Sequence, residues 1–340
     1  FKSGNRSDVT NYRPIAIIPN FAKIFESIIA HKLYSHIANS LVPEQHGFVR
    51  GRSTSTNLCN FTQLVSNALN DRKQVDVVYT DFSKAFDQVS HELVVNKLHT
   101  FGICDNLVEL FISLLDDRKN YVEYRGVQSY LYDTFSGVTQ GSNLGPLMFL
   151  VFINDIVKCF NSKVYLYADD LKIVRIIESY EDCLVLQSDI NALCGWCNGN
   201  KLQINKKKCD VMTFLRKPVN IIFDYTFDSD IINRCDVKKD LGVIFDPVLS
   251  FIPHYQYVVG KSYKMLGFII RNSRSFTHID SFKILFFAFV RSHLEYCSII
   301  WNPHYQIHIH SIESIQCKFL KYLYFVKHRE SPESGYQYYN

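Results

Sequence analysis

The chain has 340 residues, of which 47% are hydrophobic, 21% charged and 14% aromatic, with only 14 glycines and 9 prolines. Such a composition can bury a large core and excludes disordered, fibrous and collagen-like proteins. The formal net charge of +4 is too small to indicate a nucleic-acid binder by itself.

Helices are predicted over most of the first 130 or so residues. Apolar residues recur at helical spacing in segments 21–37, 58–69 and 107–114, which gives each segment one apolar face. Between the first two, residues 45–54 are polar and contain glycine, so they are predicted to form a loop. The apolar face of the first segment consists of Phe21, Phe25, Ile29, Leu33 and Ile37.

Acidic residues follow two predicted strands. Residues 75–81 are rich in Val and Tyr and predict a strand that ends on Asp81. Residues 163–174 are apolar on both sides of Asp169 and Asp170, which is typical of two strands joined by a tight turn. The sequence therefore predicts carboxylates at the ends of strands.

Two further segments have recognisable patterns, one of a hairpin and one of helices. Residues 119–132 predict a hairpin that turns at Arg125 and Gly126. Beyond the last strands, residues 261–325 are aromatic and predict helices. One helical face there consists of Phe282, Leu285, Phe286, Phe289 and His293.

Carboxylates in an otherwise apolar sheet are costly to bring together unless a cation lies between them. Two divalent ions held about 3.5 to 4 Å apart by oxygen ligands would clamp the attacking and leaving oxygens of a phosphoryl displacement. Because neighbouring strand residues point to opposite faces, Asp169 is preferred over Asp170 as a direct ligand. Taken alone, an Asp-Asp pair at a turn tip is also explained by simple solvation.

Motifs around the acids narrow the interpretation. Phe82-Ser-Lys-Ala-Phe86 follows the first acid, Ser136-Gly-Val-Thr-Gln-Gly-Ser-Asn-Leu-Gly-Pro146 opens a predicted helix, and Tyr167-Ala-Asp-Asp170 forms the turn. In order and spacing they resemble motifs A, B and C of a reverse transcriptase palm. Other segments resemble the remaining landmarks of non-LTR (LINE-type) retrotransposon reverse transcriptases, nearest to the Jockey-like insect elements: Asn11-Tyr-Arg-Pro-Ile15, Gly47-Phe-Val-Arg-Gly-Arg-Ser-Thr54, Asn205-Lys-Lys-Lys208 and Leu241-Gly-Val-Ile-Phe-Asp246.

The resemblance implies an α+β chain with the right-hand polymerase fold, in which fingers and palm carry an antiparallel sheet and the thumb is helical. Fingers and palm would occupy residues 1–250. The fingers would lie at about 1–74 and 88–130, and the palm at about 75–87 and 131–250. Residues 251–340 would form a helical, thumb-like region whose C-terminal end could be truncated.

The same resemblance implies an RNA-directed DNA polymerase. Its partners would be an RNA template, a DNA primer or target DNA, and dNTPs. Asp81, Asp169 and Asp170 would be catalytic and would hold two Mg²⁺ ions, for which Mn²⁺ could substitute. Lys208 would protonate the pyrophosphate leaving group, although Lys206 and Lys207 beside it leave open which amine acts.

Further contacts are implied residue by residue. Phe86, five positions after Asp81, matches the steric gate that excludes a ribose 2′-hydroxyl. Thr139 stands where most family members have Pro, which loosens that turn slightly. The dNTP would meet Arg13, Lys23, Phe82, Lys84, Ala85, Phe86, Gln140 and Gly141. Nucleic acid would meet Arg50, Arg52, Leu241, Gly242, Lys261, Lys264 and Arg271.

Three alternative functions fit parts of the sequence. An inactive element relic would keep the fold and only bind nucleic acid, but the acids, Phe86 and the Gln-Gly-Ser motif are all intact. A two-metal nuclease would have no use for Phe86 at that offset. A structural nucleic-acid scaffold would not need to bring three acids together.

Further features of the sequence bear on the partners and the location of the protein. Residues 251–340 hold 10 basic and 5 acidic residues, so the small net charge conceals a basic predicted thumb. No apolar run reaches the roughly 18 to 20 residues that cross a bilayer, and the ten cysteines follow no disulfide framework. The chain starts at Phe1 without a Met or a leader, so we expect an excerpt of a longer cytoplasmic and nuclear protein with no membrane partner.

Overall fold

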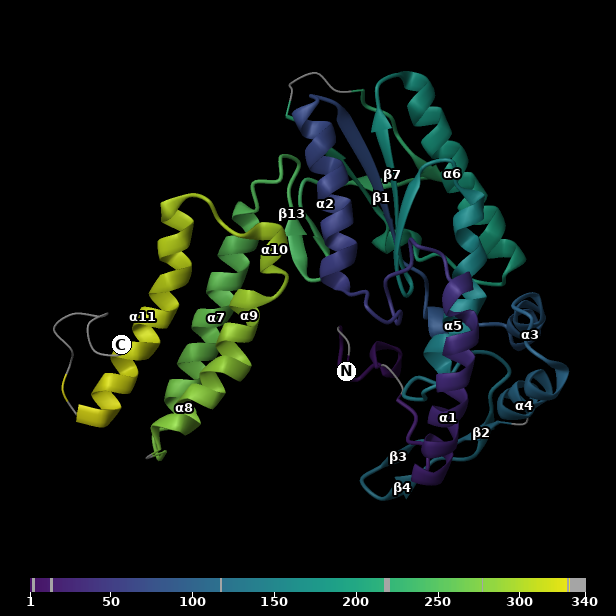
Figure 1. Ribbon diagram of the computed structural model, residues 1–340, viewed down its shortest axis with the longest axis horizontal. Helices are drawn as coiled ribbons and strands as arrows, with labels where there is room; N and C mark the ends of the chain where they lie inside the picture. The colour runs from purple at the N-terminus through teal and green to yellow at the C-terminus, as the bar shows by residue number, and fades with distance from the viewer. Residues whose placement is uncertain are drawn as a thin grey trace. The chain divides into compact units, whose positions relative to one another are not determined.

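The computed structural model describes residues 1, 4–12, 15–116, 118–216, 221–276, 278–328 and 330. They form two compact units, each built from several stretches of the chain (Figure 1). None of the helices in the described ranges is long and apolar enough to span a membrane. The first unit contains Phe1–Asn57, Arg72–Thr213 and Lys217–Cys235, and the second contains Leu58–Asp71, Phe214–Arg216 and Asp236–Asn340.

A five-stranded sheet with strand order β11-β8-β1-β7-β6 is the centre of the first unit. In it, β1 pairs antiparallel with β7 and β7 with β6, whereas β8 and β11 pair parallel. Every residue of β1 is buried, as its Val and Tyr content predicts. The predicted strands on both sides of the acidic turn are confirmed. The bounds are β1 (Gln74–Thr80), β6 (Lys163–Tyr167), β7 (Asp170–Ile177), β8 (Asp210–Phe214) and β11 (Asn233–Arg234).

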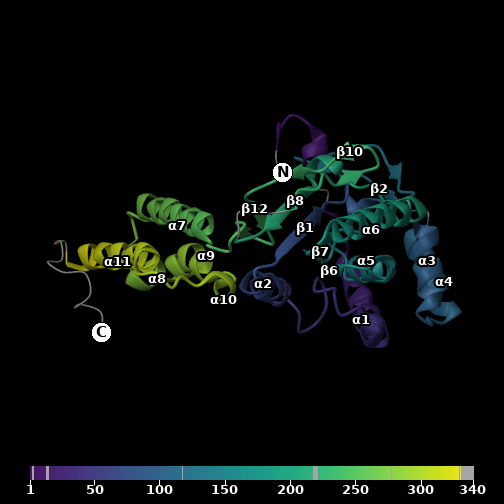
Figure 2. The same ribbon diagram turned by 90° about the horizontal axis from the view of Figure 1, so that it is seen from above.

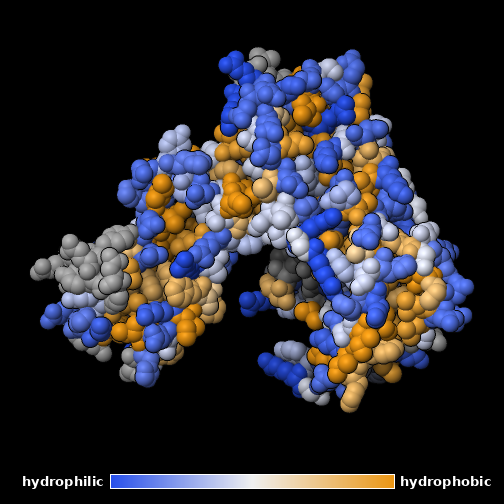
Figure 3. Space-filling model, in the orientation of Figure 1, coloured by the Kyte–Doolittle hydropathy of each residue, from blue (hydrophilic) through white to orange (hydrophobic). Residues whose placement is uncertain are grey.

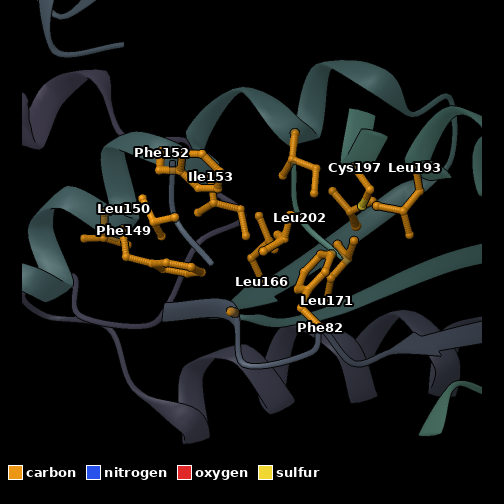
Figure 4. Packing of buried hydrophobic residues seen from close by; sticks show 14 of the residues in the cluster. Phe82, Phe149, Leu150, Phe152, Ile153, Leu166, Leu171, Leu193, Cys197 and Leu202 are labelled. Atoms are coloured by element: carbon orange, nitrogen blue, oxygen red, sulfur yellow. The ribbon is translucent and has the colours of Figure 1, made fainter. Parts of the chain in front are cut away.

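Two helices, α5 (Gly145–Ile153) and α6 (Tyr180–Gly199), cover one face of this sheet (Figure 2). All residues of α5 except Pro146 are buried, because a helix that is apolar on every side belongs inside a core. Figure 4 shows side chains of α5 and α6 packed in one cluster with Leu166 and Leu171 of the sheet.

The predicted apolar face of residues 21–37 is only half correct. In α1 (Asn20–Ile37), Leu33 and Ile37 are buried, whereas Phe21 and Phe25 are 89% and 50% exposed. The apolar surface that results lies over α1 in Figure 3. The buried apolar residues lie in the half of the helix that leads into η2 (Ala38–Ser40), whereas the buried residue of the first half is Glu26.

Short elements complete the first unit. The hairpin β3 (Glu123–Tyr124) and β4 (Val127–Gln128) turns at Arg125 and Gly126, as predicted. The other elements are η1 (Val9–Asn11), η3 (Ala85–Asp87), α3 (His91–Thr100), α4 (Asp105–Leu115), β2 (Lys119–Asn120), β5 (Tyr132–Asp133), η4 (Asn154–Cys159), η5 (Lys206–Lys208), β9 (Thr226–Phe227) and β10 (Asp230–Ile231).

The second unit is mainly helical, as predicted for residues 261–325. Phe282 and Phe286 are buried, and Phe286 stacks on Phe319 with ring centroids 4.0 Å apart. The predicted face fails at Phe289, which is 48% exposed while Val290 is buried. The cause is η6 (Phe287–Arg291), a π-helical turn that shifts the helical phase. The other elements are α2 (Thr54–Asn70), whose first residues belong to the first unit, β12 (Lys238–Asp240), β13 (Val243–Phe245), α7 (Ile252–Asn272), α8 (Ile279–Phe286), α9 (Ser292–Glu295), α10 (Ser298–Trp301) and α11 (Gln306–His328).

Candidate active site

The predicted acidic residues lie at one end of neighbouring strands. Asp81 directly follows β1, and the antiparallel register pairs Thr80 with Leu171 of β7. Asp170 opens β7 and pairs with the last residue of β6, so only Ala168 and Asp169 form the turn between these strands. The structure therefore brings Asp81 and the Asp169-Asp170 pair to the same edge of the sheet, from positions far apart in the sequence.

The segment after β1 pairs with a second segment that carries a lysine. The Ser83 amide donates to the Gln203 carbonyl oxygen at 2.8 Å, and the Asn205 amide donates to the Asp81 carbonyl oxygen at 2.7 Å. This pairing places η5 beside the acid, where Lys208 Nζ donates to Asp81 Oδ2 at 3.1 Å. The predicted catalytic carboxylate of Asp81 therefore forms an ion pair with the Lys208 ammonium group.

The neighbouring lysine Lys206 is held elsewhere. Its Nζ donates to Asp228 Oδ2 at 2.8 Å and to Asp230 Oδ2 at 3.0 Å. These two hydrogen-bonded carboxylates raise the pKa of Lys206. Lys206 thus ties η5 to the β9–β10 hairpin, while Lys208 faces Asp81.

The chemistry of the acids suits a hard divalent cation, because carboxylate oxygens are the ligands that Mg²⁺ prefers. Within the described ranges, no group of three or more His, Cys, Asp or Glu side chains lies close enough to hold a metal ion. In this arrangement Asp81 pairs with Lys208 instead. The assignment of metal ions to Asp81, Asp169 and Asp170 stays a prediction that rests on the donor chemistry.

Residues predicted to meet the triphosphate lie just past Asp81. Lys84 is exposed and has a left-handed backbone (φ 47°), and η3 begins at the next residue. Phe82 and Ala85 are 3% and 2% exposed, and Phe82 lies in the core cluster of Figure 4. Phe82 and Ala85 are therefore part of the core, and Lys84 between them is the exposed residue.

Phe86 is half-buried in a stack of aromatic rings. Its ring lies against Phe149 of α5, with centroids 4.3 Å apart and an interplanar angle of 15°. The Phe48 ring lies nearly perpendicular to it, with centroids 6.0 Å apart and an interplanar angle of 78°. The rotamer of the predicted gate is therefore set by a fully buried neighbour on one side.

Gln140 is held on both its side chain and its backbone. Its Nε2 donates to Asp87 Oδ1 at 2.8 Å, and its carbonyl oxygen accepts from the Ala16 amide at 2.9 Å. Gly141 has φ +102°, and a Cβ atom there would lie 3.0 Å from the Ala16 carbonyl oxygen, so this position requires glycine. The sequence did not reveal Asp87, whose only signal is its place directly after Phe86.

The basic residues of the first unit that are predicted to contact dNTP or nucleic acid differ in their surroundings. Arg13 lies outside the described residues. Lys23 is exposed on α1. Arg50 lies over the Tyr34 ring at 4.6 Å. Arg52 Nη1 donates to the carbonyl oxygens of Val42, Pro43 and Gln45 at 2.9, 3.2 and 2.6 Å, so this guanidinium also folds its own loop.

In the second unit, Leu241 and Gly242 form the turn between β12 and β13, where the Tyr296 hydroxyl donates to the Leu241 carbonyl oxygen at 2.7 Å. Lys239, on the same hairpin, donates to the Tyr257 hydroxyl at 2.9 Å and lies 4.6 Å from its ring centre. No sequence motif singles out Lys239 or Tyr257. The predicted nucleic-acid contacts Lys261, Lys264 and Arg271 are all exposed on α7.

Comparison with known proteins agrees with this arrangement. Residues 2–270 match the family model described as "Reverse transcriptase (RNA-dependent DNA polymerase)". The chain is 27% identical over 275 residues to the "Probable RNA-directed DNA polymerase from transposon BS" of Drosophila melanogaster, covering 75% of this chain and 30% of that protein. It is 25% identical over 334 residues to the "RNA-directed DNA polymerase from mobile element jockey" of Drosophila funebris, covering 92% of this chain and 36% of that protein.

The chain spans about a third of the length of these curated relatives. Among solved structures, apo telomerase from Candida tropicalis matches with a TM-score of 0.51 and 9% sequence identity, covering 92% of this chain and 52% of that one. At that identity the likeness concerns the fold alone. The predicted right-hand polymerase fold and the resemblance to Jockey-like non-LTR elements are confirmed.

Proposed function

The chain belongs to the reverse transcriptase (RNA-dependent DNA polymerase) family, and from this premise we propose that it copies an RNA template into DNA as the polymerase part of a Jockey-like non-LTR retrotransposon. One observation carries the proposal. The acids Asp81, Asp169 and Asp170 lie at the same edge of neighbouring antiparallel strands, with Lys208 Nζ 3.1 Å from Asp81 Oδ2.

The reaction joins a primer 3′-oxygen to the α-phosphorus of a dNTP and releases pyrophosphate. Reverse transcriptases in general use divalent metal ions, and in this chain Asp81 and Asp169 would hold two Mg²⁺ ions with support from Asp170. Bound there, the ions would lower the pKa of the 3′-hydroxyl and neutralise the triphosphate. Lys208 would donate a proton from Nζ to the leaving pyrophosphate.

Selection of the nucleotide would depend on residues around η3 and before α5. The backbone amides near Lys84 and Ala85 would receive the triphosphate. Phe86, braced by Phe149, would exclude a ribose 2′-hydroxyl by shape. Gln140, whose amide is oriented by Asp87, would contact the nascent base pair.

The RNA template and DNA primer would be held by basic residues outside the acidic edge. In the first unit, Arg50 is exposed beside Tyr34. In the second unit, Leu241 and Gly242 at the β12–β13 turn would hold the primer end, and the exposed cations of α7 would contact the phosphate backbone.

The test is extension of a DNA primer on a homopolymer RNA template with Mg²⁺ and dNTPs. Asp169→Ala and Asp81→Asn should each lower the extension rate by about a thousandfold. Each variant would lose several kcal/mol of the stabilisation that metal ions give to the transition state, and each 1.36 kcal/mol corresponds to a tenfold change in rate. Asp228→Asn is the matched control, since Asp228 also pairs with a lysine, at 2.8 Å, but lies on the β9–β10 hairpin.

The control should extend at the wild-type rate. If the wild-type chain binds an RNA–DNA duplex but extends no primer, the polymerase proposal fails for this chain and the relic interpretation replaces it. Equal extension by wild type and Asp169→Ala would remove Asp169 from the active site.

A further inference from the structure

The turn that carries Asp169 has an unusual backbone. Ala168 adopts the left-handed region, with φ 55°, although residues other than glycine, asparagine and aspartate rarely do so. Only Ala168 and Asp169 join β6 to β7. Such a conformation persists only when surrounding contacts hold it in place, and the loop that carries Gln45 and Gly47 contacts Ala168 directly.

Gln45 meets both polar backbone groups of Ala168. Its Oε1 accepts from the Ala168 amide at 2.8 Å, and its Nε2 donates to the Ala168 carbonyl oxygen at 3.2 Å. The same Oε1 accepts from the Gly47 amide at 2.7 Å. Gln45 is only 1% exposed, and these hydrogen bonds supply the partners that its buried amide needs.

The loop around Gln45 also pairs with the end of β6. The Leu166 amide donates to the Glu44 carbonyl oxygen at 3.0 Å, and the His46 amide donates to the Leu166 carbonyl oxygen at 2.9 Å. Asn57 Nδ2 donates to the same Leu166 oxygen at 3.0 Å. The loop therefore continues the strand pairing up to the turn, and Gln45 extends it through its side chain.

Gly47 allows this close approach. A Cβ atom at this position would lie 2.2 Å from the Ala168 backbone nitrogen, which no side chain could tolerate without displacing the turn. The glycine and the glutamine thus act on the same backbone residue from one loop.

We propose that Gln45 is a positioning residue of the reaction: its side-chain amide clamps the Ala168 backbone and so fixes the place of the Asp169 carboxylate. This inference rests on the proposed polymerase function. A glutamine suits the task because its amide offers one acceptor and one donor in a fixed plane, which match the N–H and C=O of a single backbone residue. Asparagine would be one methylene too short to reach both.

The test compares Gln45→Met with Gln187→Met. Methionine keeps a similar length and removes both hydrogen-bonding groups. Gln187 is a matched control because it makes the same two-point clamp on another backbone residue, accepting from the Thr226 amide and donating to its carbonyl oxygen, both at 2.9 Å.

Two measurements are made on each variant. In single-nucleotide addition, Gln45→Met should lower kcat by about tenfold to a hundredfold, as expected for a displaced reacting group. Its KM for dNTP should change by less than about threefold, since an interaction used only in the transition state is removed. In hydrogen exchange, peptides that span residues 164–171 should exchange faster in Gln45→Met, whereas Gln187→Met should keep the wild-type kcat and the wild-type exchange in this turn.

Unchanged exchange in residues 164–171, or faster exchange with a wild-type kcat, would overturn the proposal. If Gln45→Met does not fold, Gln45→Glu replaces it. That variant keeps the acceptor for the Gly47 and Ala168 amides, but it replaces the donor with a carboxylate oxygen that faces the Ala168 carbonyl oxygen. Wild-type kcat and exchange in the folded protein would overturn the proposal equally. A wild-type chain that extends no primer defeats the proposed function instead, and the exchange experiment then still decides whether Gln45 holds the turn.

Discussion

At the scale of single residues, Lys208 differs from its neighbours in the acid that it meets. Lys206 is bound by Asp228 and Asp230, and Lys208 by the predicted catalytic Asp81. The sequence left open which of three consecutive amines acts. The contacts favour Lys208 as the proton donor.

Replacing Lys208 by Ala should lower the rate of single-nucleotide addition by about a hundredfold, the usual contribution of a general acid. Lys208→Arg should be nearly as slow, because a guanidinium keeps the charge beside Asp81 but does not release its proton at neutral pH. Rapid-quench kinetics with an RNA template would measure both rates.

Lys207→Ala is the matched control and should keep the wild-type rate. If Lys208→Arg were as fast as wild type, the role of Lys208 would be electrostatic and proton donation would have to be assigned elsewhere. A slow Lys207→Ala would reverse the assignment between these two lysines.

The acids of the site could be predicted from the sequence because their signal is local: a carboxylate directly after a strand, or at the tip of a tight turn. Their supports could not be predicted in this way. Gln45 meets Ala168 across 123 residues, and Gln140 meets Asp87 across 53. Contacts over such distances depend on the register of the sheet and the packing of loops, which no short pattern records.

At the scale of secondary-structure elements, the β12–β13 hairpin is joined to α7 by a buried histidine. His254 is 1% exposed, and its Nδ1 accepts from the Ile244 amide of β13 at 3.2 Å. Its ring meets the Trp301 ring at 4.9 Å. Burial, and secondarily the charge of Lys239, lower the pKa of His254 to about 4.

This lowered pKa makes the stability depend on pH with a defined sign. The unfolded chain protonates His254 near its ordinary pKa of about 6.5, whereas the folded chain resists protonation down to about 4. The stabilisation is therefore complete above about pH 6.5 and is lost as the pH falls toward 4. In that window His254 should add up to about 1.4 kcal/mol per pH unit to the slope of the free energy of unfolding.

Urea unfolding of wild type and His254→Gln at several pH values between 4 and 7 would measure this slope. The variant should be less stable at pH 7 but flatter with pH. His310→Gln, at an exposed position of α11, should keep the wild-type slope. Parallel curves for wild type and His254→Gln would show that His254 does not titrate in this window.

Element types could be read from periodicity, but phase and burial could not always be. Phe289 is exposed because the π-helical turn η6 shifts the face that began at Phe282. Phe21 is exposed because burial in α1 is confined to residues further along the helix. Both differences arise from local geometry and packing that amino-acid spacing does not encode.

At the scale of the whole molecule, charge is unevenly distributed along the chain. Residues 251–340 hold twice as many basic as acidic residues, whereas residues 1–250 hold 27 basic and 28 acidic ones. Lys261, Lys264 and Arg271 are exposed on α7. Under the proposed function, this face of α7 would supply counter-charge to the phosphates of template and primer.

Neutralising Lys261, Lys264 and Arg271 together with Gln should shorten the products of primer extension. It should also reduce the salt dependence of duplex binding. The slope of log K against log salt concentration should become shallower by about 0.9 for each phosphate that the variant no longer neutralises. Gel analysis of product lengths and binding titrations at several salt concentrations would measure these effects.

Lys283→Gln with Arg291→Gln is the control, because these cations of the second unit already pair with Asp280 and Glu295. The control should leave product length unchanged. Equal shortening in both variants would mean that total charge, rather than the face of α7, retains the duplex.

The stacking of Phe86 on Phe149 links the position of the Phe86 ring to substitutions in the core of related chains. Phe149 is fully buried in a helix with no exposed face to relieve a change of volume, and close-packed interiors pass such changes to their neighbours. A drift in core side chains would thereby tilt the Phe86 ring. Under the role proposed for Phe86, discrimination between deoxyribose and ribose would then change through substitutions in the interior while the motif around Asp81 remains intact.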